Sequence, residues 1–264
     1  MRNTYTLTIA LVAAALSSGC RLTTTNTPAT GTLVICLFDR SITADAPEIK
    51  DRYLADFVKV VAQLRPGDTV IADAITENPA ATMRFPVHVV LPAYDPARTN
   101  PLIHGREMQA ATRTLLEQVE RLVRQTASTK KTAILDALYV TRKALQGEAG
   151  KSTAHHALIV FSDMVEDSGR ANFERDPLGV QHTKSLLQRE EGSDRLPDLK
   201  GVDVWAAGAT PNRSMGEARI RAIESFWHAY FSRCGASLTA DHYAPALLNF
   251  SLVRNQPPIR DSEN

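Results

Sequence analysis

Five stretches of the chain are almost continuously apolar and rich in β-branched residues. Each is short and is bounded by turn-forming residues, as where Pro66-Gly67-Asp68 stands before the second stretch. Short, continuous apolar runs of this kind are typical of strands that are covered on both faces of a sheet. The predicted strands are residues 33–38, 69–75, 87–91, 157–161 and 202–207.

Between these runs, apolar residues recur at a spacing of three and four, which predicts amphipathic helices. The long helix is expected over residues 103–125, a further one opens at Thr132, and a short one lies near residues 183–191. The predicted buried faces are, in chain order, Leu54, Phe57, Val58, Val61 and Leu64; Met108, Ala111, Leu115, Val119 and Leu122; Ile134, Leu135, Leu138 and Leu145; and Ile220, Ile223, Trp227, Tyr230 and Cys234.

Strands that alternate with helices predict an α/β fold, with a mainly parallel central sheet and helices on both faces. Residues 76–86 join two of the predicted strands as a hairpin, so 87–91 is the one antiparallel strand. The pattern indicates one domain over residues 31–253, followed by a loose polar tail at 254–264.

The charge of the chain argues against nucleic acid as a partner. The 264 residues contain 30 Lys and Arg and 29 Asp and Glu, which gives a formal net charge of +1. Binding to nucleic acid needs a basic field or a basic patch, and no basic run with interleaved aromatic residues is present.

The first residues of the chain have the pattern of an export signal. A positive start at Met1-Arg2 precedes a short apolar run and then Ser17-Ser18-Gly19-Cys20. This order is typical of a signal peptide, here residues 1–19, and the apolar run is too short to span a membrane. An ordinary cleaved signal peptide with a chance cysteine is the alternative to a lipid anchor.

Cysteine directly after small residues resembles the lipobox of bacterial lipoproteins, in which the thiol of the cysteine, here Cys20, is acylated before cleavage. The resemblance implies an exported protein anchored in the bacterial cell envelope. Many lipoproteins that stay at the inner membrane have an aspartate directly after the cysteine. This chain has Arg21 there, which favours the outer membrane where there is one. Residues 20–30 are rich in Thr, Asn and Pro and are expected to be a flexible tether.

Two further cysteines, Cys36 and Cys234, lie within a predicted strand and near the end of a predicted helix. Export would permit a disulfide between them. A cysteine within an apolar strand is more often a small buried hydrophobic residue, so two free thiols are expected.

Oxygen-bearing side chains follow two of the predicted strands and one loop. Asp39, Ser41 and Thr43 come after the first strand, Asp163 comes after the strand at 157–161, and Thr132 stands before a helix. Because ligands of open parallel sheets bind at the carboxyl ends of the strands, these side chains are expected at one edge. Carboxylate and hydroxyl oxygens suit a hard cation such as Mg²⁺.

These residues resemble the metal-ion-dependent adhesion site (MIDAS) of von Willebrand factor A (vWA) domains. That family has Asp-x-Ser-x-Ser after its first strand, a threonine in a middle loop, and an aspartate in a Thr-Asp-Gly turn after its fourth strand. Asp39 and Ser41 match the first element, and Thr43 keeps the hydroxyl of its last serine. Thr132 fits the middle element and Asp163 the last, although Met164 replaces the glycine.

The resemblance covers residues 31–253 and implies a three-layer, Rossmann-like vWA fold. It implies that Asp39, Ser41, Thr43, Thr132 and Asp163 bind Mg²⁺, with Mn²⁺ or Ca²⁺ as alternatives. A protein partner would complete the metal shell with an acidic side chain. The expected function is a lipid-anchored binding module of the cell envelope and not an enzyme.

Two other interpretations of the strand ends remain open. Ser and Asp after a strand also serve as turn formers and helix caps, which would leave a scaffold with a silent site. A metal-dependent phosphohydrolase of the haloacid dehalogenase type also has an aspartate at the end of its first strand. It usually has a second aspartate two residues later, where this chain has Ser41, which cannot perform the same proton transfer.

Three further segments carry weaker signals. Gly150-Lys151-Ser152 lacks the first glycine and the strand-to-helix context of a phosphate loop, and is expected to be a solvated turn. His155 and His156 lack further zinc ligands at the usual spacing and are expected at the surface. Glu166 and Asp167 are expected in an acidic loop at the rim of the cation site.

Overall fold

The structure is a computed structural model that describes residues 31–126, 130–149, 153–210 and 215–252. The proposed signal peptide, Cys20, the tether, the tail and Gly150-Lys151-Ser152 lie outside these ranges.

The centre of the domain is a six-stranded sheet with the order β3-β2-β1-β4-β5-β6. In that order the strands are Val87–Val90, Thr69–Ile75, Gly31–Asp39, Thr153–Phe161, Val202–Ala207 and Tyr243–Ala244. All neighbouring pairs are parallel except β2 and β3, which form an antiparallel hairpin. The predicted mainly parallel sheet with one antiparallel strand is therefore confirmed.

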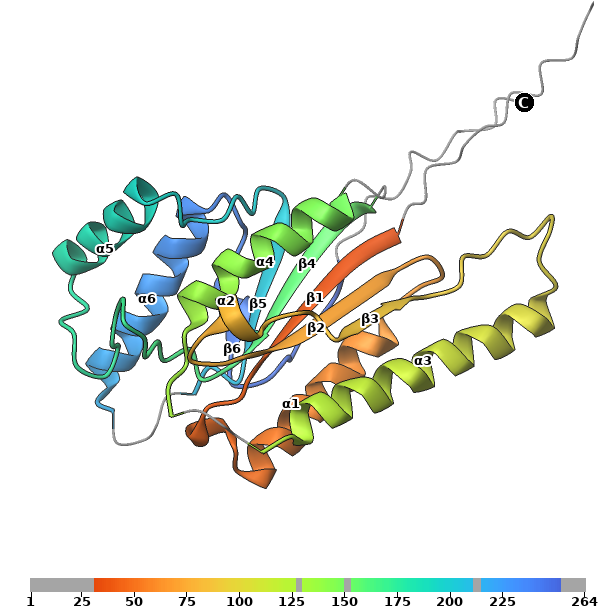
Figure 1. Cartoon of the computed structure of the whole chain (residues 1–264), viewed down its shortest axis with the longest axis horizontal. Helices are drawn as coiled ribbons and strands as arrows, with labels where there is room; N and C mark the ends of the chain where they lie inside the picture. The colour runs from red at the N-terminus through yellow and green to blue at the C-terminus, as the bar shows by residue number, and fades with distance from the viewer. Residues whose placement is uncertain (1–30, 127–129, 150–152, 211–214, 253–264) are drawn as a thin grey trace, which may run out of the picture.

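Helices cover both faces of the sheet, which confirms the three-layer α/β architecture (Figure 1). One face carries α1 (Pro47–Ala62) and α3 (Pro101–Arg124). The other carries α4 (Ile134–Ala149), α6 (Glu217–Arg233) and, outside them, α5 (Val180–Gly192). Short elements link the rest: η1 (Ile42–Ala44), α2 (Pro79–Thr82) and η2 (Ala240–His242). No described helix combines the length and the apolarity needed to cross a bilayer.

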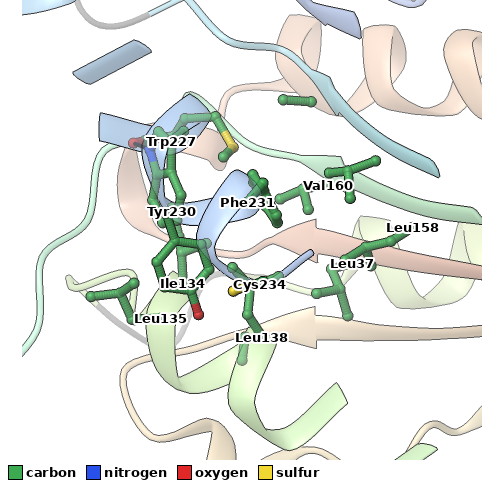
Figure 2. Packing of buried hydrophobic residues seen from close by; sticks show 14 of the residues in the cluster. Leu37, Ile134, Leu135, Leu138, Leu158, Val160, Trp227, Tyr230, Phe231 and Cys234 are labelled. Carbon is green, nitrogen blue, oxygen red and sulfur yellow. Dashed lines mark hydrogen bonds between the residues drawn. The ribbon is translucent and has the colours of Figure 1, made fainter. Parts of the chain in front are cut away.

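Strand β1 divides the core into two hydrophobic clusters because its side chains alternate between the faces. Leu33, Ile35 and Leu37 join the cluster under α4 and α6, and the residues between them join the cluster under α1 and α3. Figure 2 shows the first cluster, in which aromatic residues of α6 meet leucines of α4 and aliphatic residues of β1 and β4. Every residue of β1 is buried, as its continuous apolar sequence predicts.

The predicted buried face of α1 was wrong at one position. Val58 is 53% exposed, whereas Tyr53, Phe57 and Val60 are buried against the sheet. Successive helical residues are about 100° apart, so Val58 lies beyond the edge of the face that is centred near Phe57. Leu54, Val61 and Leu64 pack at the border of the cluster.

Both described cysteines, Cys36 and Cys234, are buried free thiols, which confirms the expectation for this pair. They belong to the two different hydrophobic clusters, one on each face of the sheet. Burial raises the pKa of both thiols, in the case of Cys234 to about 12, so neither is poised to react as a thiolate.

Candidate metal centre

Asp39 is the last residue of β1, and the chain turns sharply after it. Its Oδ1 accepts a hydrogen bond from the backbone N–H of Ser41 over 2.8 Å, which fixes the turn. The hydroxyls of Ser41 and Thr43 then lie 2.8 Å apart, with Ser41 buried and Thr43 exposed. The backbone of Asp39-x-Ser41-x-Thr43 therefore directs all three oxygen-bearing side chains to one side of the strand end.

Two other segments meet the carboxylate of Asp39. Ser162, directly after β4, donates its hydroxyl to Oδ2 over 2.9 Å. Thr132, in the loop before α4, donates to Oδ1 over 3.4 Å. Asp39, Thr132 and Ser162 are each at most 4% exposed. The structure thus brings the first and middle parts of the predicted site into direct contact.

The loop of Thr132 is held in place by its backbone. The N–H of Ala133 donates to the carbonyl of Thr76 over 3.1 Å, and the N–H of Asp167 donates to the carbonyl of Thr132 over 2.9 Å. These bonds tie the loop to the end of β2 and to the segment that follows β4. The position of Thr132 therefore depends on two neighbours that are remote in sequence.

Glu166 does not line the rim, as the sequence had suggested, but is completely buried. Its Oε2 accepts from the backbone N–H of Leu135 over 3.0 Å, in the first turn of α4. A carboxyl there satisfies a helix N–H that has no partner within the helix. Burial raises the pKa of Glu166 to about 8. The role of this residue is to hold the start of α4, next to Thr132.

Asp163 reaches the site from the turn after β4. Its Oδ1 accepts from the N–H of Val165 over 2.9 Å, and the side chain is partly exposed, beside the cavity that Thr43 also lines. Burial, and then the negative charge of Asp39, raise the pKa of Asp163 to about 7. Burial also raises the pKa of Asp39, against the opposing effect of its hydrogen bonds.

Met164 adopts a backbone conformation that favours glycine. Its φ is +64°, in the left-handed region that residues other than glycine seldom occupy. The turn is stabilised by two bonds: the N–H of Met164 donates to the hydroxyl of Ser162 over 3.0 Å, and Nε1 of Trp227 donates to the carbonyl of Met164 over 2.8 Å. These two bonds hold Met164 in its left-handed conformation.

A cavity of about 320 Å³ opens beside Asp163. Its wall includes Gly208, which follows β5 with a φ of +88° and packs against the ring of Tyr53. Burial and the charges of Asp39 and Asp163 raise the pKa of the Tyr53 hydroxyl. The lining residues are Thr43, Ala44, Ile49, Arg52, Tyr53, Asp163, Gly208 and Thr210.

The donor set fits a hard divalent cation. Among the described residues, no lysine, arginine or histidine forms an ion pair with Asp39 or Asp163. Arg40, within the motif, points elsewhere and donates to the Gln125 side chain and to the Thr126 carbonyl. Two neighbouring carboxylates without an ion-pair partner are unfavourable unless a cation or a proton is present. Hydroxyl and carboxylate oxygens are the ligands that Mg²⁺ prefers.

The site is not a carboxylate-rich metal cage. In the described part of the chain, no group of three or more His, Cys, Asp or Glu side chains is arranged to hold a metal ion. His155 and His156 are partly exposed on β4, several residues before the end that carries the site. Burial lowers the pKa of His156, as does the charge of His155. A larger groove, about 580 Å³, lies between α5 and α6 and includes no residue of the site.

Three residues of the site were not among the predicted ligands. Ser162 precedes Asp163 and donates a hydrogen bond to Asp39. Gly208 has no side chain and so leaves space for the ring of Tyr53 in the cavity wall. Glu166 accepts a hydrogen bond from the first turn of α4. Only Ser162 carried a usable sequence signal, since it ends the apolar run of β4 together with Asp163.

The sequence matches no family model and no curated protein. Among solved structures, the fold is similar to human Sec24c, a COPII-coat protein, with 15% identity and a TM-score of 0.40 over 74% of this chain. A von Willebrand factor type A protein from Catenulispora acidiphila has 10% identity and a TM-score of 0.35 over 78% of this chain. The pilus adhesin SpaC from Lactobacillus rhamnosus GG, in its open conformation, has 10% identity and a TM-score of 0.42 over 81%. The chain spans 28%, 42% and 28% of the lengths of these proteins.

Proposed function

We propose that this chain is a vWA-type binding module of the bacterial cell envelope that engages a protein partner through a divalent cation. Asp39, Ser41, Thr43, Thr132 and Asp163 would hold the ion. The observation that supports this is the proximity of two carboxylates, Asp39 and Asp163, at strand ends where the hydroxyls of Ser41, Thr43 and Thr132 also gather.

Recognition of the partner would follow from the small number of carboxylates. Hydroxyls would bind the Mg²⁺ directly and Asp39 would hold it through water, so the ion would keep a coordination position for a further anionic oxygen. The partner's aspartate or glutamate would approach past Thr43, into the cavity that Asp163 and Arg52 line. Ile42, 56% exposed between Ser41 and Thr43, offers an apolar contact beside this acidic side chain.

The location is a separate part of the proposal. Export by the signal at residues 1–19 and acylation of Cys20 would anchor the domain in the envelope, with the outer membrane favoured. Several acyl chains on one cysteine would hold it firmly, since each buried methylene adds about 0.8 kcal/mol. We propose no catalytic step, because Ser41 stands where a phosphohydrolase of the haloacid dehalogenase type has its second aspartate.

Calorimetric titration with Mg²⁺ and Mn²⁺ tests the cation site. The parent protein should bind one ion, and Asp39→Ala and Asp163→Asn should each abolish binding. Asp56→Asn is the control, because Asp56 is a buried carboxylate of α1 that contacts Lys59 and Leu247, outside the site. Absence of cation binding by the folded parent would exclude the proposed function.

Partner capture from membranes, with and without a chelator, tests whether a protein partner binds through the cation. Capture that Mg²⁺ supports and that chelator and Asp39→Ala abolish is the expected result. Capture that is equal with chelator would instead support a scaffold with a silent site. Turnover of generic phosphoesters in the presence of the metal would support the hydrolase alternative.

A further inference from the structure

Large hydrophobic side chains are exposed together at one end of the domain. Tyr94, Leu102 and Ile103 are 43%, 78% and 55% exposed, and they lie in the loop after β3 and in the first turn of α3. We call these three residues the apolar tip. In Figure 1 this loop and the start of α3, in yellow, project beyond the sheet. Contiguous exposed apolar groups of this kind mark interaction sites more often than scattered single residues do.

The apolar tip is built so that its side chains stay outside. Asn100 caps α3, because its Oδ1 accepts from the N–H groups of Leu102 and Ile103 over 2.9 and 3.4 Å. His104, the next residue, is buried, with its Nε2 3.1 Å from the Pro92 carbonyl and its ring 4.8 Å from that of Tyr94. The helix start is thus fixed to the loop by His104, and the aliphatic side chains before it face outward.

The apolar tip extends from the edge of the sheet at which the described chain begins. The N–H of Gly67 donates to the carbonyl of Leu91, just before the loop, over 3.1 Å. The carbonyl of the same Gly67 packs so closely on Gly31 that a Cβ atom there would lie 2.1 Å from it. Gly31 and Leu91 therefore flank Gly67, while Asp39 lies at the opposite end of β1.

The link from Cys20 to Gly31 limits how far this edge can be from a lipid anchor. Eleven residue steps span at most about 40 Å, even when fully extended. If Cys20 is acylated, Gly31 and its end of the sheet lie within that distance of the membrane surface. The apolar tip is on the same side, and the cation site faces away.

We propose that the apolar tip inserts into the surface of the membrane that holds the lipid anchor. The charged residues around the apolar tip are balanced, with Arg98 paired to Asp95 over 3.7 Å and Arg106 next to Glu107 in sequence. The contact therefore depends on apolar burial and does not require anionic lipid. Tyr94 has the amphipathic ring that is favoured at the level of the lipid headgroups. The inference rests on the anchor at Cys20, and not on the cation.

Depth measurement on the full, acylated protein in vesicles of phosphatidylethanolamine and phosphatidylglycerol tests this inference. A polarity-sensitive fluorophore is attached at Gly105→Cys, beside the apolar tip, and in a control at Gly179→Cys, before α5. Both glycines are exposed, and a Cβ at either meets nothing within 4 Å. The native Cys36 and Cys234 are buried and will not compete for the label.

A quencher carried on the lipids should reduce the fluorescence at position 105 several-fold more than at position 179. The double variant Leu102→Ser, Ile103→Ser should remove this difference while the protein stays on the vesicles. Equal, weak quenching at both positions would overturn the inference. Protection at 105 from both lipid-borne and aqueous quenchers would also overturn it, in favour of a second copy or a protein partner over the apolar tip.

Mass spectrometry of the N-terminal peptide separates failure of the anchor from failure of the cation site. Cys20 without acyl chains would remove the geometrical basis of the inference and overturn it. The Mg²⁺ titration is independent of this result, because Asp39 and Asp163 lie at the other end of the sheet.

Discussion

The hydroxyl of Ser162 donates to Oδ2 of Asp39 over 2.9 Å and joins the ends of β4 and β1. The same hydroxyl oxygen accepts from the N–H of Met164 over 3.0 Å. One completely buried serine thus positions both the first carboxylate of the site and the turn that carries the second.

Replacement of Ser162 by alanine should weaken both the fold and the cation site. It leaves the N–H of Met164 and an oxygen of Asp39 without a partner, and a buried group left unpaired costs about 1–3 kcal/mol. We expect a loss of that size in the free energy of unfolding, measured by chemical denaturation, and weaker Mg²⁺ binding by calorimetry. Ser185→Ala, at an exposed site on α5, should change neither; an unchanged Ser162→Ala protein would contradict the assigned role.

The left-handed backbone of Met164 predicts an order among its variants. Met164→Ala and Met164→Gly both lose a completely buried side chain and should both be less stable than the parent. The glycine variant should be the more stable of the two by about 1 kcal/mol, because only glycine adopts positive φ without a steric cost. Thermal and chemical denaturation of the pair measure this difference. A more stable alanine variant would show that the turn relaxes once the side chain is removed.

Gly208 should tolerate no side chain. A Cβ atom there would lie 2.7 Å from Cε1 of Tyr53, and the φ of +88° is unfavourable for alanine. We expect Gly208→Ala to lower the free energy of unfolding by about 1–3 kcal/mol, as overpacking and strain commonly do. Gly105→Ala is the matched control, since it lies in α3 with open space around its Cβ, and should stabilise by up to about 1 kcal/mol. Denaturation curves of equal midpoint for the two variants would contradict this assignment.

The raised pKa of Glu166 predicts that the free energy of unfolding falls as the pH rises. Its pKa is raised from 4.5 to about 8 in the folded protein, so between these values the folded state keeps a proton that the unfolded state has lost. The free energy of unfolding should therefore decrease with pH across this window, and one such group contributes up to about 1.4 kcal/mol per pH unit. Asp163, with its raised pKa, adds to the slope up to about pH 7.

The variant Glu166→Gln isolates the contribution of this residue. Glutamine keeps an acceptor oxygen for the N–H of Leu135 but takes up no proton, so the slope of stability against pH should become shallower. Denaturation at intervals between pH 5 and 8 measures it. The same slope in parent and variant would mean that Glu166 is ionised in the folded protein.

The strands were predicted well where both faces of the sheet are covered. The runs at 69–75 and 202–207 coincide with β2 and β5, because full burial leaves a continuous apolar sequence. The elements α2 and β6 were not predicted. They have four and two residues, too few for a hydrophobic period to appear. Val58 was placed wrongly because the exact border of a helical face depends on what packs against it.

The candidate site was predictable as a set of oxygen donors but not as an arrangement. The order of Asp39, Thr132 and Asp163 along the chain indicated one sheet edge, and the structure brings Thr132 within 3.4 Å of Asp39. The roles of Ser162 and Glu166 depend on contacts across 123 and 31 residues, which local spacing does not contain. Whether these donors bind a cation stays a prediction.

Strand β1 sets a fixed separation between its two ends. It has nine residues, all buried, and the eight steps from Gly31 to Asp39 at about 3.3 Å each span roughly 26 Å. A longer segment before Gly31 would let the domain lie farther from the proposed lipid anchor, but it could not shorten this span. A partner at the proposed cation site would therefore dock about 26 Å from the N-terminal end of strand β1, whatever precedes Gly31.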